Sequence, residues 1–176
     1  MARLETTYMG LTLKNPIIAA SSGLTETIKS IAQLEENGIG AIVLKSLFEE
    51  EILREMIANM SRMNSSSDLY PESLEYYELH STLEESTDHY LELIREAKKT
   101  VKIPVIASIN CISASQWTYF PKLIQEAGAD ALELNIYLLA TEFNRTCVTI
   151  ENEYIEIVKD LRDAELPGRE VATSTY

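Results

Sequence analysis

The sequence predicts an α/β fold in which parallel strands alternate with helices. Short apolar runs end repeatedly at polar residues or glycine, and segments with helical spacing of apolar residues follow them. Residues 34–45 and 124–135 also share one pattern, a helix end followed by glycine, a small residue and a strand. This alternation favours a parallel sheet with right-handed crossovers, and such sheets bind ligands at the carboxyl ends of their strands.

The first strand is expected at residues 17–20, where an apolar run ends at Ser21-Ser22-Gly23. Thr25 is expected to cap the helix that follows, and Gly38 to end it. The apolar face of this helix consists of Ile28, Ile31 and Leu34. The segment therefore forms one strand–helix unit.

The second strand is expected at residues 41–44 and leads into Lys45-Ser46. The long connection after it is expected to hold a helix near residues 48–60 and a helix or helix pair over 71–99. The polar loop between them, residues 61–71, is long enough to cover an active site, and solvent-exposed slack is the alternative.

Two more strand–helix units follow. The third strand, residues 104–109, runs into Asn110, and a helix is expected over residues 115–127. The fourth strand, residues 131–135, ends at an asparagine, and the last helix is expected over about residues 151–164. The apolar face of the last helix consists of Tyr154, Ile157, Val158 and Leu161.

Composition excludes several classes of function. The 176 residues include 28 acidic and 15 basic side chains, and the net charge of −13 argues against a nucleic-acid partner. No apolar run approaches the ~18 residues that span a bilayer, and no signal-peptide pattern is found. Cys111, Cys147, His80 and His89 show no metal-ligand spacing. We therefore expect a cytoplasmic protein without a membrane segment or a metal site.

Four segments resemble class 1 dihydroorotate dehydrogenases, and more closely the dihydroorotate dehydrogenase-like proteins. They are residues 11–16 leading to Ser21-Ser22-Gly23, residues 41–46, residues 108–113 and residues 132–135. Their order and spacing match the family over roughly residues 5–162. The resemblance implies a flavoprotein oxidoreductase, an FMN-dependent (β/α)8 TIM barrel that oxidises dihydroorotate to orotate in pyrimidine biosynthesis. About the first four strand–helix units of that barrel, a half barrel, are expected here.

The resemblance also implies roles for individual residues. Ser22 and Gly23 would approach the flavin with a hydroxyl group and bare backbone, and Ser46 would hydrogen-bond to it. Lys45 would lie near the isoalloxazine ring and the carboxylate of the small-molecule substrate, where a cation stabilises negative charge. Asn135 would bind the flavin or the substrate.

Two further asparagines complete the implied site. Asn110 is a weaker candidate for the flavin, and Asn64 is the one plausible remnant of the family's substrate loop. The residues alone leave a structural role open, because Lys45 could extend its ammonium group to solvent and Asn135 could cap a strand end.

One departure from the family concerns the catalytic base. The family places a cysteine or serine three residues after the asparagine that ends the fourth strand. Leu138 occupies that position here and cannot accept a proton, and removal of a general base typically costs about 10²–10⁴-fold in rate. Tyr137 and Cys147 are conceivable but poor substitutes. We therefore predict no catalytic residue.

The second departure concerns the last residues of the sequence. Residues 1–164 are expected to form the amino-terminal part of the barrel, and residues 165–176 a disordered tail outside the family. A complete barrel takes about 250 residues and commonly binds phosphate after its last two strands, so a truncated product without the phosphate-binding half is expected. Its open edges predict a homo-oligomer or aggregation. The alternative function is an inactive remnant or a self-associating interaction module.

Overall fold

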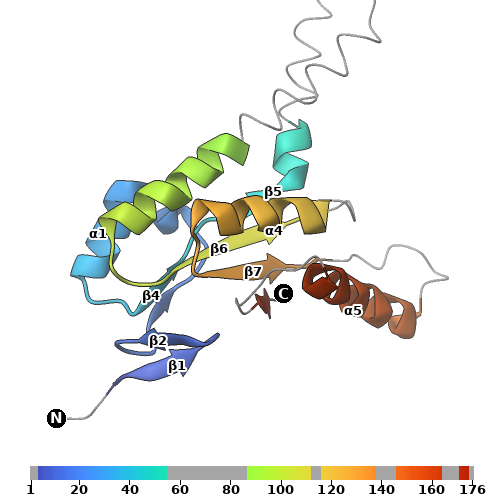
Figure 1. Ribbon diagram of the computed structural model, residues 1–176, viewed down its shortest axis with the longest axis horizontal. Helices are drawn as coiled ribbons and strands as arrows, with labels where there is room; N and C mark the ends of the chain where they lie inside the picture. The colour runs from blue at the N-terminus through green and yellow to red at the C-terminus, as the bar shows by residue number, and fades with distance from the viewer. Residues whose placement is uncertain (1–3, 55–86, 112–115, 138–145, 164–170, 175–176) are drawn as a thin grey trace, which may run out of the picture.

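The computed structural model describes residues 4–54, 87–111, 116–137, 146–163 and 171–174 (Figure 1). The strands are β1 Thr6–Tyr8, β2 Leu11–Leu13, β3 Ile18–Ala19, β4 Ala41–Val43, β5 Leu47–Phe48, β6 Val105–Asn110, β7 Ala131–Asn135 and β8 Val171–Ser174. The helices are the short 3-10 helix η1 Gly23–Thr25, α1 Ile28–Glu36, α4 Gln116–Ala127 and α5 Cys147–Asp163. Residues 49–54 and 87–100 are also helical.

The strands of the main sheet are all parallel, which confirms the predicted α/β class. The order is β3-β4-β6-β7-β8, with the short β5 also paired to β6, and β1 and β2 form a separate antiparallel hairpin. The longest pairing joins β6 to β7 from Ile106↔Ala131 to Ile109↔Leu134. The strand order therefore follows the order along the chain.

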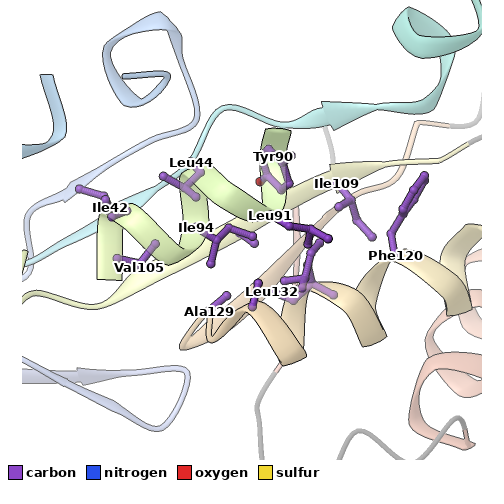
Figure 2. Packing of buried hydrophobic residues seen from close by; sticks show 14 of the residues in the cluster. Ile42, Leu44, Tyr90, Leu91, Ile94, Val105, Ile109, Phe120, Ala129 and Leu132 are labelled. Atoms are coloured by element: carbon purple, nitrogen blue, oxygen red, sulfur yellow. The ribbon is translucent and has the colours of Figure 1, made fainter. Parts of the chain in front are cut away.

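The helices cover one face of this sheet, and Figure 1 shows α1, α4 and the helix 87–100 on the same side. The cluster between them and the sheet is shown in Figure 2. Its strand members are Ile42, Leu44, Val105, Ala107, Ile109, Leu132 and Leu134. Its helix members include Ile31, Leu91, Ile94, Phe120, Ile124 and Leu161. The apolar spacing of the predicted helices thus corresponds to this buried face.

The opposite face of the sheet carries the alternate side chains of the same strands. Towards the amino ends of the strands this face is apolar and packs against Leu13 of the β1–β2 hairpin. The strand residues of this second cluster are Ala41, Val43, Ile106 and Ala131. Towards the carboxyl ends of the strands the same face becomes polar, and Ser108 is the next residue after Ile106 on that face.

Two helix starts differ from the prediction. The N-cap of α1 is Thr27, whose Oγ1 accepts a hydrogen bond from the Ser30 amide at 3.3 Å, and not Thr25, which belongs to η1. The last helix begins at residue 147 instead of 151, because Thr146 Oγ1 accepts from the Thr149 amide. Gly38 ends α1 as expected, with φ +93°.

Of the segment expected to be a disordered tail, the structure describes only residues 171–174. Residues 171–174 form β8, which pairs in parallel with β7 from Leu132↔Val171 to Asn135↔Ser174. The edge of β7 offers unpaired backbone groups, and a segment with valine and threonine suits strand pairing there. The predicted loop 61–71 and residues 164–170 lie outside the described residues.

Candidate functional site

The candidate site lies at the carboxyl ends of β3, β4, β6 and β7. The pairing with β6 is interrupted there. The Leu44 amide still donates to the Ile106 carbonyl oxygen at 2.8 Å, but the chain then leaves β6 until Leu47 pairs with Ile109. Lys45 and Ser46 lie in this interruption. The strand pairing is therefore interrupted at Lys45 and Ser46, two of the predicted site residues.

Tyr90 fills the place of the missing strand partner. Its hydroxyl group donates to the Ser108 carbonyl oxygen at 3.0 Å and accepts from the Ser108 amide at 3.0 Å. Burial raises the pKa of Tyr90, and the nearby Glu133 carboxylate raises it further, so the phenol stays protonated. The helix 87–100 thereby satisfies backbone groups that the gap in the sheet would leave unpaired.

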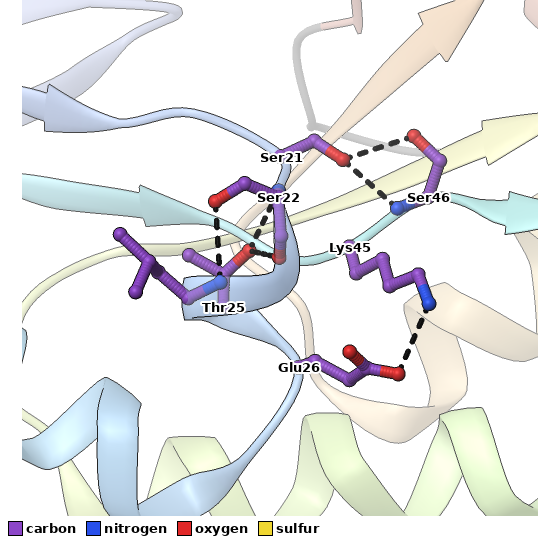
Figure 3. Close-up of polar contacts among 7 residues, drawn as sticks. Ser21, Ser22, Thr25, Glu26, Lys45 and Ser46 are labelled. Atoms are coloured by element: carbon purple, nitrogen blue, oxygen red, sulfur yellow. Dashed lines mark hydrogen bonds and ion pairs between the residues drawn. The ribbon is translucent and has the colours of Figure 1, made fainter.

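Four polar side chains form a row across this end of the sheet, from Ser21 through Ser46 and Ser108 to Glu133. The Ser21 and Ser46 Oγ atoms are 3.1 Å apart, and the Ser46 amide donates to Ser21 Oγ at 2.9 Å (Figure 3). Ser46 Oγ lies 2.7 Å from Ser108 Oγ, which donates to Glu133 Oε1 at 2.8 Å. We call these four residues the serine–glutamate row. It connects four neighbouring strand segments through hydroxyl groups.

Lys45 points towards solvent at the rim of the site. Its Nζ donates to Glu26 Oε1 at 3.0 Å, and both side chains are about half exposed. The hydrogen bond from Lys45 to the Glu26 carboxylate is the main cause that raises the pKa of the lysine. Figure 3 shows this pair beside the Ser21–Ser46 contact. Lys45 is therefore a cation whose partner also lies at the rim.

Ser22 and Gly23 begin the short helix η1 at this rim. Ser22 Oγ accepts from the Leu24 amide at 3.3 Å, while Thr25 Oγ1 accepts from the Ser22 amide at 3.2 Å. Both Ser22 and Gly23 are exposed. Among the described residues, a Cβ atom placed on Gly23 would meet Glu26 Oε2 alone, at 3.9 Å. The backbone of Gly23 is thus open to a ligand.

Asn110 and Asn135 end the two central strands side by side. Asn110 Nδ2 donates to the Asn135 carbonyl oxygen at 2.6 Å, so Asn110 fixes the end of β7. The side chain of Asn135 is partly exposed, and no hydrogen bond of its amide group is found within the described residues. Asn135 is therefore available to a ligand, whereas Asn110 serves partly as a strand clamp.

The remaining predicted residues divide into three groups. Asn64, Leu138 and His80 lie outside the described residues, so their predicted roles stay predictions. Tyr137 and Cys147 are exposed. Cys111 is buried, and this burial is the main cause that raises the pKa of its thiol. The nearby Glu49 carboxylate raises the pKa further, so the thiol stays protonated. Within the described part of the chain, no three metal-ligand side chains gather.

Five residues of this region were not predicted from the sequence: Ser21, Glu26, Tyr90, Ser108 and Glu133. A signal existed for Ser108 and Glu133, since each is a polar residue inside an otherwise apolar strand. No such signal marks Tyr90, which occupies an ordinary apolar position of its helix. The candidate site is therefore more polar and more connected than the predicted one.

Comparison with known proteins gives two informative relatives, while no family model matches the sequence. The chain is 32% identical over 139 residues to the protein named dihydroorotate dehydrogenase B (NAD(+)), catalytic subunit, of Thermoplasma acidophilum. It is 28% identical over 145 residues to the protein of the same name from Thermoplasma volcanium. Each match covers 77% of this chain, and the chain spans about 42% of the length of either relative. No helix among the described residues is long and apolar enough to cross a membrane.

Proposed function

Because the chain is dihydroorotate dehydrogenase-like over most of its length, we propose that it belongs to an FMN-dependent oxidoreductase that converts dihydroorotate to orotate. The observation that carries this proposal is that Lys45 and Ser46 follow β4 and Asn135 ends β7, at the carboxyl ends of strands of one parallel sheet. Pyrimidine biosynthesis would be the setting of this reaction.

The fold supports a half barrel better than a doubly wound sheet. In doubly wound proteins the strand order reverses, and helices cover both faces. Here the order follows the chain, and the apolar residues of all four longer helical segments pack in one cluster on one face. The other face is apolar towards the amino ends of the strands and polar towards their carboxyl ends. The interior of a barrel with its site at the carboxyl ends has this arrangement. We therefore assign the sheet to part of a TIM barrel.

The residues present fit FMN. Gly23 leaves open space above its backbone, so a flat ring system can approach it closely. The half-exposed ammonium group of Lys45 and the amide group of Asn135, which has no partner among the described residues, supply donors for carbonyl oxygens and ring nitrogens. Bound FMN would supply the acceptor of two electrons. Ser22, Gly23, Lys45, Ser46, Asn110 and Asn135 are the residues proposed to hold it.

Each of these residues has a defined task in the proposal. Lys45 stabilises negative charge that develops beside it, and exchanges Glu26 for the carboxylate of the substrate. Asn135 orients the amide edge of the substrate, together with Asn64 of the predicted loop. Asn110 keeps Asn135 in place through its carbonyl oxygen. Activity, substrate and cofactor are all parts of this proposal.

A titration of the purified chain with FMN tests the proposal. We expect the fluorescence of FMN to be quenched at a saturating stoichiometry of one, and dihydroorotate to bleach the yellow absorption. The variant Lys45→Met is expected to weaken FMN or orotate binding by about tenfold, the equivalent of ~1.4 kcal/mol. Lys29→Met, which changes an exposed lysine of α1, is the matched control and should bind as the unmodified chain does. Absence of any FMN or orotate binding would contradict the proposal.

The second candidate is an inactive, self-associating module. One observation favours it, which is the exposure of large apolar side chains at Tyr137, Val148 and Ile155 on and beside α5. This candidate predicts a colourless protein that does not bind FMN and whose apparent mass in gel filtration rises with concentration. A monomeric yellow protein would rule it out.

A further inference from the structure

The serine–glutamate row has only one arrangement of hydrogen atoms while Glu133 is ionised. A carboxylate has no proton to donate, so Ser108 donates to Glu133 Oε1. Each serine hydroxyl group carries one proton, so Ser46 must donate to Ser108 in the 2.7 Å contact. Ser21 must then donate to Ser46 in the 3.1 Å contact. All three hydroxyl protons therefore point from the open side of the site towards Glu133.

Such a directed row is a path for a proton. We propose that Glu133 is the terminal proton acceptor of the candidate site, and that Ser21, Ser46 and Ser108 carry the proton to it. The inference rests on the proposed function and deepens it, because Leu138 stands where the family places its base. Ser21 is partly exposed at the site, whereas Ser46 and Ser108 are buried. The row thus joins two partly exposed residues, Ser21 and Glu133, through two buried hydroxyl groups.

The transfer balances without any further reactant. The acidic C–H group of the substrate, next to a carbonyl group, releases a proton to Ser21 Oγ, and the electron pair of that bond stays on the substrate as an enolate. The proton of Ser21 passes to Ser46 Oγ, that of Ser46 to Ser108 Oγ, and that of Ser108 to Glu133 Oε1. Three O–H bonds break, three hydroxyl groups form again, and Glu133 becomes a neutral carboxylic acid. The hydrogen-bond direction of the whole row is then reversed.

A purely structural role explains the row less well. On the same face, the residues next to the row towards the amino ends of the strands are Ala41, Val43, Ile106 and Ala131. Apolar side chains at the positions of the row would therefore extend this apolar layer. Polar side chains held against an apolar core cost desolvation that hydrogen bonds only partly return. The row also departs from the other buried polar contact here, in which Tyr90 serves backbone groups. Side chains bonded to one another in a single direction suit transfer.

The first test uses the ligand-free chain, so it does not depend on the proposed function. The Ser46 amide donates to Ser21 Oγ at the far end of the row. We expect its amide resonance to shift with the same midpoint as the side-chain carboxyl carbon of Glu133. In Ser108→Ala the carboxyl carbon should still titrate while the Ser46 amide no longer follows. A Ser46 amide that ignores the Glu133 titration in the unmodified chain would overturn the inference.

Two variants separate the row from other charges nearby. Glu26 and Lys45 lie at the rim and Tyr90 contacts Ser108, so each could influence the Ser46 resonance. Glu26→Gln should preserve the coupled titration, and Tyr90, whose pKa burial raises, titrates outside the acid range. Glu133→Gln keeps an oxygen that accepts from Ser108 but removes the titration, so the Ser46 shift should vanish. A Ser46 shift that persists in Glu133→Gln would also overturn the inference.

The second test follows the proton of the substrate itself. Dihydroorotate is incubated in D2O with the chain free of FMN, and loss of its C–H signal beside the carbonyl group is followed by NMR. We expect Glu133→Gln to slow this exchange at least tenfold at unchanged affinity for orotate, while Glu92→Gln, an exposed matched change, has no effect. Equal exchange in Glu133→Gln would overturn the relay. Failure of the unmodified chain to bind orotate would instead contradict the proposed function, and the Ser46 test would still decide on the row.

Discussion

The two ends of the parallel sheet use their polar side chains in opposite ways. At the amino ends, polar side chains are bound to the backbone. Asp130 Oδ2 accepts from the Val105 amide at 2.8 Å and from Lys98 Nζ at 2.6 Å. Glu35 Oε1 accepts from the amides that precede β6, those of residues 102 and 103. These carboxylates hold strand ends in place.

At the carboxyl ends, several polar side chains bind other side chains or point to solvent. In the serine–glutamate row the hydroxyl groups bind one another and the Glu133 carboxylate, and the ion pair of Lys45 is half exposed. Tyr90 and Asn110 serve backbone groups there, as do Ser21, Ser22 and Thr25. The difference indicates that polar groups at the amino ends stabilise the fold, whereas the carboxyl ends keep polar groups free for a ligand. Substitutions at the two ends should therefore have different consequences.

Gly40→Ala at the amino end should have the largest effect on stability. The Gly40 amide donates to the Ile17 carbonyl oxygen at 2.7 Å, and a Cβ atom at this position would lie 2.2 Å from the Asn15 backbone oxygen. Two backbone segments must separate to admit it, so we expect a loss of about 3 kcal/mol or more in the free energy of unfolding. Urea unfolding followed by circular dichroism measures this loss.

Gly23→Ala at the carboxyl end is the matched comparison. Its Cβ atom would meet only Glu26 Oε2, at 3.9 Å, so we expect the free energy of unfolding to change by less than ~0.5 kcal/mol. Under the proposed function the same variant weakens FMN binding. Equal destabilisation by both glycine variants would contradict the proposed difference between the two ends of the sheet.

Tyr90→Phe should have an intermediate effect. Removing the hydroxyl group leaves the Ser108 amide and carbonyl oxygen without their partner in the gap beside β6. A buried unsatisfied pair of this kind costs about 2 kcal/mol in the free energy of unfolding, again measured with urea. Tyr119→Phe, at an exposed position of α4, is the control and should stay within ~0.5 kcal/mol. Unchanged stability of Tyr90→Phe would show that the gap does not need the phenol.

The parallel sheet could be predicted because its strands are buried on both faces and therefore appear as continuous apolar runs. The predicted strand at residues 131–135 has the observed bounds of β7, and that at residues 104–109 differs from β6 by one residue. β8 could not be predicted, because a strand of four residues owes its pairing to the free edge of β7 and not to its own pattern. Thr27 was missed as a cap because Thr25, two residues earlier, is an equally good candidate by residue type.

The candidate site was predicted only in outline. Lys45, Ser46, Asn110 and Asn135 follow directly from strand ends, and all four lie at the same edge of the sheet. The contacts of Tyr90 with Ser108 and of Ser108 with Glu133 join residues that are 18 and 25 positions apart in the sequence. Such contacts depend on how the helix 87–100 and β7 pack against β6. Apolar spacing predicts which face of a helix is buried, but not which polar atom ends beside which backbone group.

Glu26→Gln should have a small effect on stability and should also change ligand binding. The pair with Lys45 is half exposed, so its loss should cost less than ~1 kcal/mol. Because Glu26 raises the pKa of Lys45, the folded chain holds this proton more tightly than the unfolded chain does. The contribution of the pair is therefore complete below pH 10.5 and is lost as the pH rises through the higher folded-state pKa.

Binding should respond to Glu26→Gln in the opposite direction. Lys45 no longer has to leave a carboxylate in order to meet an anionic ligand, so orotate should bind about two- to fivefold more tightly. Glu36→Gln, an exposed change of the same charge at the end of α1, is the control, and titration calorimetry beside urea unfolding measures both effects. Weaker orotate binding in Glu26→Gln would mean that Glu26 positions Lys45 for the ligand. Loss of a side-chain contact at the carboxyl ends is thus expected to cost little stability and to increase affinity for the ligand. Loss of a contact at the amino ends is expected to lower stability alone.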